Sequence, residues 1–293
     1  MSNISSAIRA EVLIEALPFI QKFRGQTFVI KYGGSAMEDE QLIERLLRDL
    51  VFLEAVGINP VLVHGGGKSI SGKMRDAGLS ARFVNGLRVT DEATIDLVEE
   101  VLDREINPSL VNTINEFGGH AVGFSGRDVC LGEKLAPQVD AKTGETIDLG
   151  YVGTVNTLNL ETVRSIIAEE KVPVISPIAR DFNGHTLNVN ADIAAGSIAA
   201  ALGASKMIYL SDVPGIMRDV DRRDSLIPSV NSEMVQKLMD QGVIAGGMIP
   251  KVNSALKALS EGVGKVHFID GRIPHALLLE ICTNSGIGTE VLP

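Results

Sequence analysis

The residues in this sequence that are best suited to chemistry lie in glycine-rich loops that follow short apolar runs. The stretch PVLVHGGGKSISG (60–72) places Gly65–Gly67 directly after such a run. It has the outline of a P-loop, but the Walker A pattern needs glycine at position 62, where this chain has Leu62. A dinucleotide loop G-x-G-x-x-G fails in the same way, since its third glycine would fall on Ile70. What is left is a strand that leads into a helix whose free N–H groups can receive an anion.

A second glycine loop follows the first predicted strand. FVIKYGG puts Lys31 at the end of the strand and Gly33 and Gly34 at the head of the next helix. In an open parallel sheet, ligands bind outside the carboxyl ends of the strands, so neighbouring loops of this kind could hold a phosphate and its acceptor. Either loop alone is equally compatible with a tight strand-to-helix turn that binds nothing.

Further turns contain more polar side chains than a cap or a core needs. Arg88 lies in NGLRVTD and presents a planar guanidinium that can pair with a carboxylate. LNVNAD brings Asn188, Asn190 and Asp192 to a helix start, where capping explains one of them but hardly all three.

Two loops in the last third of the chain complete the set. YLSDVPGIM (209–217) ends another predicted strand in a loop. GGMIPKVNSA (246–255) opens a helix that bears Lys251 in its first turns. All these polar residues fall at predicted strand-to-helix turns, which favours one common site over a series of unrelated caps.

The elements that must position these residues alternate along the chain. From Thr27 onward, β-branched runs alternate with amphipathic segments, a pattern typical of an α/β fold with parallel strands. We predict strands at 27–31, 60–64, 120–124, 172–176, 206–210 and 265–269. We predict helices at 38–56, 91–107, 159–170, 190–202, 232–241, 248–261 and 274–282.

Two segments have their own local signals. Asn85 and Gly86 lie between apolar arms and predict a β-hairpin over 82–90. Residues 128–155 are polar and rich in turn residues, which predicts hairpins that project from the sheet. The segment that best fits a boundary between two lobes is 177–183, where Pro, Asp, Asn and Gly cluster.

The N-terminal segment 4–23 has apolar side chains at helical spacing. Pro18 has no N–H to bond back to residue 14, so we expect the helix to be kinked or broken there. A helix ahead of the first strand could pack on its own domain or reach another subunit, and the sequence favours neither.

Composition argues against several classes of protein. A net charge of −10 and a pI near 5.1 argue against a nucleic-acid surface, which needs a basic face. The apolar stretch 193–205 is shorter than the ~20 residues of a membrane-spanning helix. Glu11 and Glu15 interrupt any signal peptide, so we expect a cytoplasmic protein. Cys130 and Cys282 form no CxxC pattern, which predicts two buried thiols, no disulfide framework and no structural zinc.

With these motifs assembled, the chain resembles the amino-acid kinase family. The series KYGG, HGGG, NGLRVTD, FSGRD, DLGYVG, LNVNADIAAG, SDVPGI, GGMIPKV and DGRIPHALLLEI follows the family's order over nearly the whole chain. The resemblance implies a three-layer αβα open sandwich with a mainly parallel central sheet. It also implies an interlacing N-terminal helix over 1–24 and a kinase domain over 25–293. Within that domain, lobe 25–178 would hold the acceptor and lobe 179–293 would hold ATP.

The chemistry that the resemblance implies is transfer of the γ-phosphoryl group of MgATP to the side-chain carboxylate of N-acetyl-L-glutamate, a step of arginine biosynthesis. A carboxylate is already ionised at neutral pH, so the reaction needs no general base. Lys31 and Lys251 match the family's two transition-state lysines, and Asp192 matches the carboxylate that holds both. Phosphoryl transfer depends mostly on positioning and on stabilisation of the charge on the phosphoryl group.

The binding residues are carried over from the same match. Those for the acceptor are Gly66, Gly67, Arg88 and Asn188. Those for ATP are Gly33, Gly34, Asp212, Val213, Gly215, Met217 and Gly247. No residue is matched to a metal, so Mg²⁺ would be held through the ATP phosphates.

A kinked helix before the first strand resembles the arginine-inhibited members of the family, which are hexamers built as trimers of dimers. The residues that match their arginine site are Lys206, His267, Glu280, Gly286 and Gly288. Two departures lie near this site: Phe19 stands where tyrosine is usual in the N-terminal helix, and Glu290 stands where methionine is usual.

Other departures concern the acceptor loops. Ser35 replaces a frequent Asn, Lys68-Ser69 replaces Pro-Gln, and Thr154 replaces a frequent Glu.

Two alternatives stay open at this point. The first is a kinase for another small amino acid or acyl amino acid, against which the Arg88 hairpin argues. The second is a non-catalytic module that only senses arginine, which would be expected to lack Lys31 and Lys251.

Overall fold

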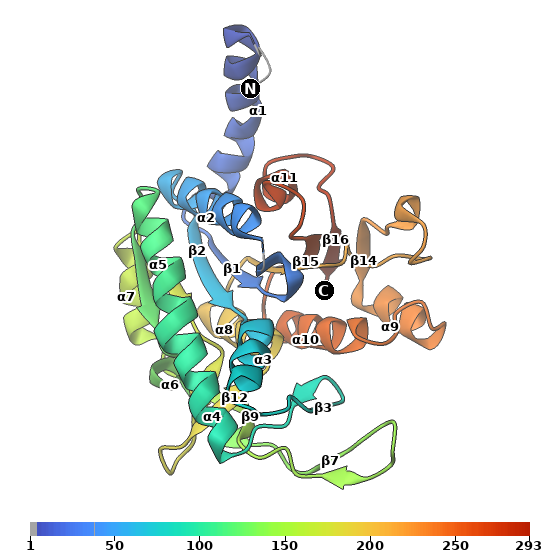
Figure 1. The fold of residues 1–293 in the computed structure, drawn as a ribbon. Coiled ribbons are helices and arrows are strands. Elements are labelled where there is room, and N and C mark those ends of the chain that lie inside the picture. Colours follow the sequence, from blue (N-terminus) through green and yellow to red (C-terminus); the bar gives the residue numbers. More distant parts are fainter. Residues whose placement is uncertain (1–4, 38) are drawn as a thin grey trace.

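A central parallel sheet organises the protein in the computed structural model, which describes residues 5–37 and 39–293 (Figure 1). The described residues form an eight-stranded sheet in which every neighbouring pair is parallel except β15 and β16. In spatial order its strands are β14 (Ser229–Asn231), β16 (Thr289–Leu292), β15 (Lys265–Asp270), β13 (Lys206–Ser211), β1 (Thr27–Tyr32), β2 (Asn59–His64), β10 (Val172–Ile175) and β5 (Ala121–Phe124). The mainly parallel sheet that the sequence predicts is confirmed.

Helices cover both faces of this sheet and make three layers. Those packed on one face are α2 (Glu40–Ala55), α5 (Asn107–Glu116) and α11 (Ala276–Ile281). Those packed on the other are α7 (Glu161–Ala168), α8 (Ala191–Leu202), α9 (Ser232–Asp240) and α10 (Met248–Ser260). In β1, Phe28 and Ile30 face the first set and Val29 faces the second, so the strand is buried on both sides. This double burial explains why the strands appear as continuous apolar runs in the sequence.

A smaller region lies below the sheet in Figure 1. In the described part of the chain, a small closed barrel is formed by β6 (Cys130–Lys134), β9 (Val152–Leu158), β11 (Ile178–Arg180) and β12 (Thr186–Val189). Beside it are α3 (Gly67–Asp76), α6 (Gly126–Val129) and the hairpins β3 (Phe83–Val84) with β4 (Leu87–Arg88) and β7 (Gln138–Val139) with β8 (Thr146–Ile147). The predicted hairpins are confirmed. The short strands β11 and β12 carried no sequence signal of their own.

The predicted helix over 91–107 is the first part of a longer rod. It consists of α4 (Glu92–Glu99), a π-helical segment (Glu100–Ile106) and α5, which continues to Glu116. Pro108 is the second residue after the π-helical segment, and in a regular α-helix its ring would clash with the carbonyl of residue 104. The wider turn gives that proline room, which is a physical reason for its position.

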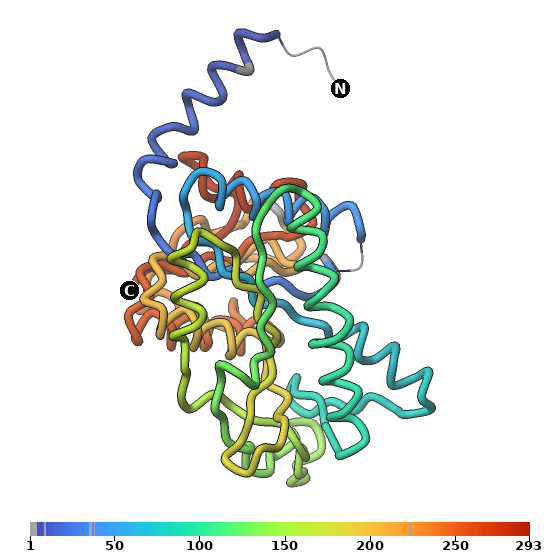
Figure 2. The backbone as a smooth tube through the Cα atoms, turned by 90° about the vertical axis from the view of Figure 1, so that its left-hand side faces the viewer, coloured from blue at the N-terminus to red at the C-terminus, as the bar shows by residue number. Residues whose placement is uncertain are grey.

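Helix α1 (Ser6–Phe23) projects away from the body of the molecule (Figures 1 and 2). The helix is not broken at Pro18. The proline leaves the carbonyl of Ile14 without its helical donor, but residue 14 is exposed, so water can satisfy that group. The exposed apolar side chains of α1 are Ile8, Val12, Leu13, Ile14 and Leu17.

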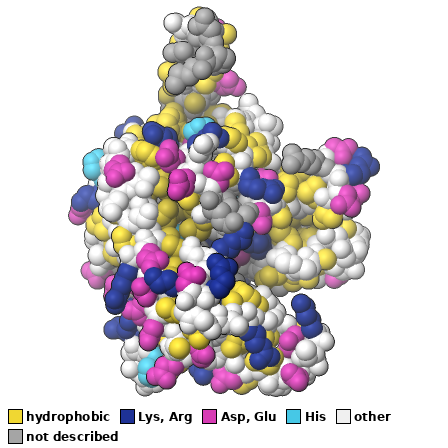
Figure 3. All heavy atoms as spheres, in the orientation of Figure 1, with side chains coloured by type: hydrophobic (Ala, Val, Ile, Leu, Met, Phe, Trp, Pro, Cys, Tyr) yellow, Lys and Arg dark blue, Asp and Glu magenta, His cyan; other side chains and the backbone are white. Residues whose placement is uncertain are grey.

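Short 3₁₀ turns at Gly34–Met37 and Arg223–Ser225 complete the described elements. No helix in residues 5–37 and 39–293 is long and apolar enough to cross a membrane. Both cysteines are free thiols, as predicted, but only Cys130 is fully buried; Cys282 follows the last turn of α11 and is half-buried. On the face in Figure 3, acidic and basic side chains are interspersed, without a continuous basic field.

Candidate active site

The two glycine loops lie side by side at the carboxyl edge of the sheet. β1 and β2 are parallel with Tyr32 opposite His64, so both loops start at the same level. The N–H of Gly65 donates to the carbonyl of Tyr32 at 2.7 Å. The Lys31 side chain folds back over Gly33, where a Cβ atom would lie 2.8 Å from Lys31 Nζ. Glycine at position 33 thus leaves room for the lysine in this position.

Two lysines share one carboxylate at this edge. Lys31 Nζ lies 2.9 Å from Asp192 Oδ1, and Lys251 Nζ lies 3.2 Å from Asp192 Oδ2. Burial disfavours the charged form of Asp192, but the charges of the two lysines outweigh it and hold the pKa of this carboxyl below its usual range. Asn190 caps α8 by accepting the Asp192 N–H at 2.8 Å, which fixes the backbone that carries the carboxylate.

A cavity of about 200 Å³, which we call the lysine cavity, opens beside this ion-pair triad. It is lined by residues from both glycine loops, from the β3–β4 hairpin and from the start of α8. The predicted site residues among them are Lys31, Gly33, Gly34, Gly66, Gly67, Arg88, Asn188 and Asp192. Gly33 and Gly34, predicted for ATP, thus lie with the predicted acceptor residues. Lys251 does not line the cavity but reaches its rim through Asp192.

Arg88 is a buried cation without a carboxylate partner in the described residues. Its Nη2 donates to the Gly67 carbonyl at 2.7 Å and to Ser71 Oγ at 2.8 Å. Its guanidinium also lies 4.7 Å from the centroid of the Phe83 ring. Burial lowers the pKa of Arg88, which reflects the cost of keeping this charge away from water. An incoming carboxylate would offset that cost.

Ser71 and Phe83 are site residues that the sequence interpretation missed, although each has a signal. Ser71 follows Gly67 by four residues, which puts both on the same face of α3. The turn at Asn85 and Gly86 is a two-residue hairpin loop, which sets Phe83 opposite Arg88, as the structure shows.

Asn188 is tied to the same hairpin region through Thr90. Its Nδ2 donates to Thr90 Oγ1 at 3.1 Å, and Thr90 Oγ1 donates to the Arg88 carbonyl at 2.8 Å. The amide and the guanidinium are thereby held in one hydrogen-bonded unit at the cavity wall.

A second cavity, of about 370 Å³, lies beyond the end of β13; we call it the β13 cavity. Of the predicted ATP residues it is lined by Asp212, Val213, Gly215 and Met217, whereas Gly247 does not line it. It is also lined by Met248, one turn before Lys251 on α10, so this helix connects the two cavities.

Arg272 lines the β13 cavity as well and was not predicted. Asp270 holds it through two hydrogen bonds of 2.8 Å, one to Nε and one to Nη2. This pairing keeps a cation at the cavity wall while 47% of the side chain stays exposed.

The described side chains do not form a metal-binding site of their own. In the described part of the chain, no three His, Cys, Asp or Glu residues are close enough together to hold an ion. Asp192, the carboxylate of the lysine cavity, is already paired with two ammonium groups.

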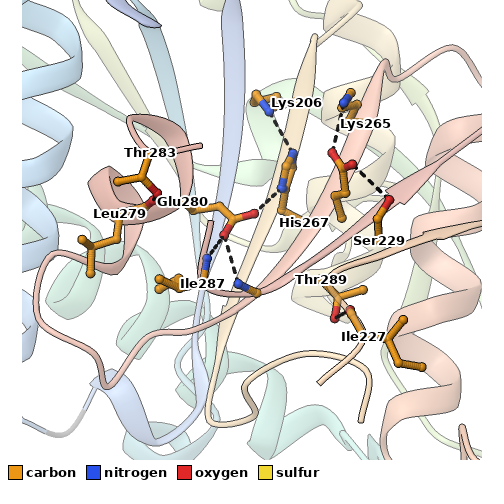
Figure 4. A network of polar contacts seen from close by, with 12 residues as sticks. Lys206, Ile227, Ser229, Lys265, His267, Leu279, Glu280, Thr283, Ile287 and Thr289 are labelled. Atoms are coloured by element: carbon orange, nitrogen blue, oxygen red, sulfur yellow. Dashed lines mark hydrogen bonds and ion pairs between the residues drawn. The ribbon is translucent and has the colours of Figure 1, made fainter. Parts of the chain in front are cut away.

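A third cavity, of about 430 Å³, lies between α1 and α11; we call it the α11 cavity. All five residues predicted for the effector line it: Lys206, His267, Glu280, Gly286 and Gly288. Figure 4 shows the chain of contacts, in which Lys206 Nζ lies 2.9 Å from His267 Nε2 and His267 Nδ1 lies 2.7 Å from Glu280 Oε1.

Neighbouring charges and burial shift the pKa values of the side chains in this cavity. Burial, together with the nearby Lys265, lowers the pKa of Lys206 to about 8. Burial also lowers the pKa of His267, so the neutral ring accepts from Lys206 and donates to Glu280. Burial tends to raise the pKa of Glu280, but hydrogen bonds from His267 and from the Ile287 N–H keep it below its usual range.

The structure places Phe19 and Glu290, the two residues that depart from the family pattern near this cavity. Phe19 lines it from α1. Glu290 accepts from Lys265 at 3.0 Å and from Ser229 at 3.0 Å. The added carboxylate is therefore paired with a lysine of the same cavity wall.

Comparison with known proteins gives close relatives over the whole length. Residues 26–270 match the amino acid kinase family. Acetylglutamate kinase of Akkermansia muciniphila is 49% identical over 285 residues, which cover 97% of this chain and 95% of that protein. Acetylglutamate kinase of Caldanaerobacter subterraneus subsp. tengcongensis is 50% identical over 284 residues, which cover 97% of this chain and 93% of that protein.

Among solved structures, N-acetylglutamate synthase from Neisseria gonorrhoeae, complexed with coenzyme A and N-acetyl-glutamate, matches with a TM-score of 0.85 at 24% identity. The match covers 97% of this chain and 63% of that one, so this chain spans less than two thirds of the synthase. At this identity the likeness shows the fold alone.

Proposed function

This chain belongs to the amino acid kinase family, and we propose that its lysine cavity is where the γ-phosphoryl group of ATP passes to the side-chain carboxylate of N-acetyl-L-glutamate. The enzyme is a phosphotransferase of arginine biosynthesis, as its acetylglutamate kinase relatives of about half identity support. The observation that carries the site assignment is the Lys31–Asp192–Lys251 triad. It joins two residues of the lysine cavity to a lysine of α10, the helix whose Met248 lines the β13 cavity.

The triad supplies what this reaction needs. The attacking carboxylate is ionised at neutral pH, so no base has to remove a proton. The ammonium groups of Lys31 and Lys251 stabilise the negative charge on the oxygens of the passing phosphoryl group, because both are held in place before the substrates arrive. Asp192 keeps the two lysines apart from each other and directed at one point. The N–H groups of Gly66 and Gly67 add backbone donors from the start of α3.

The other cavity residues orient the substrates. Arg88 and Asn188 bind the α-carboxylate of the acceptor, and the buried, carboxylate-free setting of Arg88 supports this role. In the β13 cavity, Asp212 and its neighbours up to Met217 receive the nucleotide, with Gly247 near the phosphates. Mg²⁺, held by the ATP phosphates, would neutralise charge there, because the described residues provide no cage of their own. We propose the same division into an acceptor lobe over 25–178 and an ATP lobe over 179–293, with Asn188 as an acceptor residue that the second lobe contributes.

We also propose that the α11 cavity binds L-arginine as a feedback effector. It combines a buried carboxylate, Glu280, with a buried amine, Lys206, which suits a ligand that carries both a carboxylate and a guanidinium. Phe19 of α1 lines the same cavity, so occupancy can be coupled to the projecting helix. The exposed apolar side chains of that helix support a homo-oligomer in which α1 interlaces subunits, with a hexamer as the expected form.

Acyl phosphate formation tests the reaction and the substrate together. Purified enzyme, MgATP and N-acetyl-L-glutamate should yield an acyl phosphate that hydroxylamine traps as the hydroxamate. L-glutamate in place of its acetylated form serves as the control and should give little product. Hydroxamate from L-glutamate but none from N-acetyl-L-glutamate would overturn the substrate assignment. A non-catalytic sensing module would give no hydroxamate with either, and the paired lysines argue against it.

A further inference from the structure

We propose that His64, a residue without a role in the chemistry above, is the positioning residue that directs the Gly66 N–H into the lysine cavity. The inference deepens the proposed function and rests on it. His64 ends β2 and is fully buried, directly before the three glycines. It does not line the lysine cavity, so it acts on the reacting groups only through the loop.

The contacts of His64 determine which ring nitrogen carries the proton. Nδ1 lies 2.9 Å from the Gly65 carbonyl oxygen, which can only accept, so Nδ1 donates. Nε2 lies 3.2 Å from Asn107 Nδ2, which can only donate, so Nε2 accepts. Asn107 gives its other amide proton to the Val174 carbonyl at 2.9 Å, which fixes the orientation of the amide. A neutral ring protonated at Nδ1 satisfies all these partners.

The buried setting favours the same neutral form. Burial lowers the pKa of His64 to about 4, although the hydrogen bond to the Gly65 carbonyl opposes that shift. The ring is therefore uncharged at neutral pH and serves as a fixed donor.

The bond to the Gly65 carbonyl sets the direction of the next N–H. The C=O of Gly65 and the N–H of Gly66 belong to one planar trans peptide, in which the two groups point in opposite directions. Because the carbonyl points to the buried ring of His64, the Gly66 N–H points to the other side of the loop. Gly66 lines the lysine cavity on the way from β2 to α3.

The remaining loop carbonyls are also bonded to protein donors. The Gly66 carbonyl accepts from the Ile70 N–H at 2.9 Å, and the Gly67 carbonyl accepts from Arg88 at 2.7 Å. All three glycine carbonyls are thus held by the protein, which turns the donor side of the loop toward an incoming anion.

The π-helical segment holds the loop from a second direction. A Cβ atom at Gly66 would lie 2.6 Å from Leu102 Cδ2 and 2.8 Å from Ile106 Cδ1. Asn107, the next residue along the rod, holds His64. One helical rod therefore packs against Gly66 and fixes the ring that orients its peptide plane.

A matched pair of substitutions separates the two ends of the ring. In His64→Asn the amide nitrogen falls near the place of Nδ1 and can still donate to the Gly65 carbonyl. In His64→Gln the amide oxygen can take the place of Nε2 and accept from Asn107, but no donor lies near the place of Nδ1, so the bond to the loop is lost. Both variants remove the same buried ring, so a merely structural role would affect both equally.

We expect kcat of the His64→Gln enzyme to fall on the order of 10²-fold, since a misplaced donor to the reacting groups costs about that much. The His64→Asn enzyme should retain a kcat at least about tenfold higher than that of His64→Gln, by the same principle. KM for ATP should change little in both, because other elements form the β13 cavity. Equal losses in the two variants, or near-normal rates in both, would overturn the proposal.

A spectroscopic measurement on the unaltered enzyme does not depend on how the variants fold. With all five histidines labelled with ¹⁵N, the His64 resonances should report a neutral ring protonated at Nδ1 at neutral pH. A ring protonated at Nε2, or an imidazolium, would contradict the proposal. This measurement is also separate from the proposed function. A wild-type enzyme that makes no acyl phosphate from N-acetyl-L-glutamate would overturn the substrate assignment. The tautomer of His64 instead tests whether its ring donates to the Gly65 carbonyl.

Discussion

Asp192 is the residue on which the charge balance of the lysine cavity depends. It lies between two ammonium groups at 2.9 and 3.2 Å, and its side chain is 13% exposed. Without it, Lys31 and Lys251 would repel each other across a site with little water. With it, the site has one net positive charge from the triad, to which Arg88 adds a second in the same cavity wall. Although the protein has a net charge of −10, this cavity therefore has a net positive charge that suits two anionic substrates.

Substitution of either lysine tests this balance. Lys31→Ala and Lys251→Ala each remove one charge-assisted contact to the phosphoryl group and should lower kcat by ~10²-fold or more. The hydroxamate assay under saturating substrates measures the loss. Lys68→Ala is the matched control, because Lys68 follows the glycine loop but does not line the lysine cavity. If Lys68→Ala lost as much activity as the other two, the roles assigned to Lys31 and Lys251 would not stand.

At the scale of elements, a hydrogen bond between Asp49 and His275 joins helices α2 and α11. Asp49 of α2 is almost completely buried, and its Oδ1 lies 2.6 Å from Nδ1 of His275, which directly precedes α11. Burial raises the pKa of Asp49 to about 6, although the hydrogen bond with His275 opposes the shift. Since α11 also carries Glu280 of the α11 cavity, this contact connects the wall of that cavity to α2.

The sign of the pH effect follows from that raised pKa. The folded protein binds the Asp49 proton more tightly than the unfolded chain, so Asp49 contributes stability at low pH that is lost as the pH rises through about 6. The free energy of unfolding of wild type, relative to that of Asp49→Asn, should therefore be ~1 kcal/mol higher at pH 5 than at pH 7.5, which means a more stable wild type at the lower pH. Urea denaturation at both pH values measures this difference.

Asp76→Asn provides a control on an exposed carboxylate at the end of α3. Its stability relative to wild type should change much less between the two pH values. A difference between wild type and Asp49→Asn that stays constant, or grows with rising pH, would show that the buried carboxyl does not titrate in this range.

At the scale of the whole molecule, α1 is a helix whose apolar surface the other described residues leave exposed. Ile8, Leu13 and Ile14 are at least half exposed, while the carboxyl end of the helix, with Phe19 and Phe23, lines the α11 cavity. One helix therefore connects a surface suited to another subunit with the proposed arginine site.

Removal of the residues before Phe23 should abolish arginine inhibition and reduce the oligomer, because both depend on α1. Arginine titration of activity and light scattering after gel filtration measure the two effects. The double variant Leu13→Ser, Ile14→Ser separates them, since it alters the exposed surface and leaves Phe19 and Lys22 at the cavity. Unchanged inhibition after truncation would place the effector site elsewhere.

The sequence by itself determined the local features of this protein. Apolar runs marked the strands, because strands buried on both faces need apolar residues throughout. Asn85-Gly86 fixed the hairpin and, with it, the pairing of Phe83 with Arg88. Leu62 was enough to reject a P-loop. The ordered motifs, by resemblance, then supplied the family and the reaction.

Only the tertiary structure decided which distant residues meet. Lys251 and Asp192 are 59 residues apart and touch because α8 and α10 pack on the same face of the sheet. The π-helical turn before Pro108, and the bond from Asn107 to His64, depend on packing between the rod and β2, which local patterns do not encode. Burial and pairing, and therefore the charge state of each site residue, are properties of the packed layers.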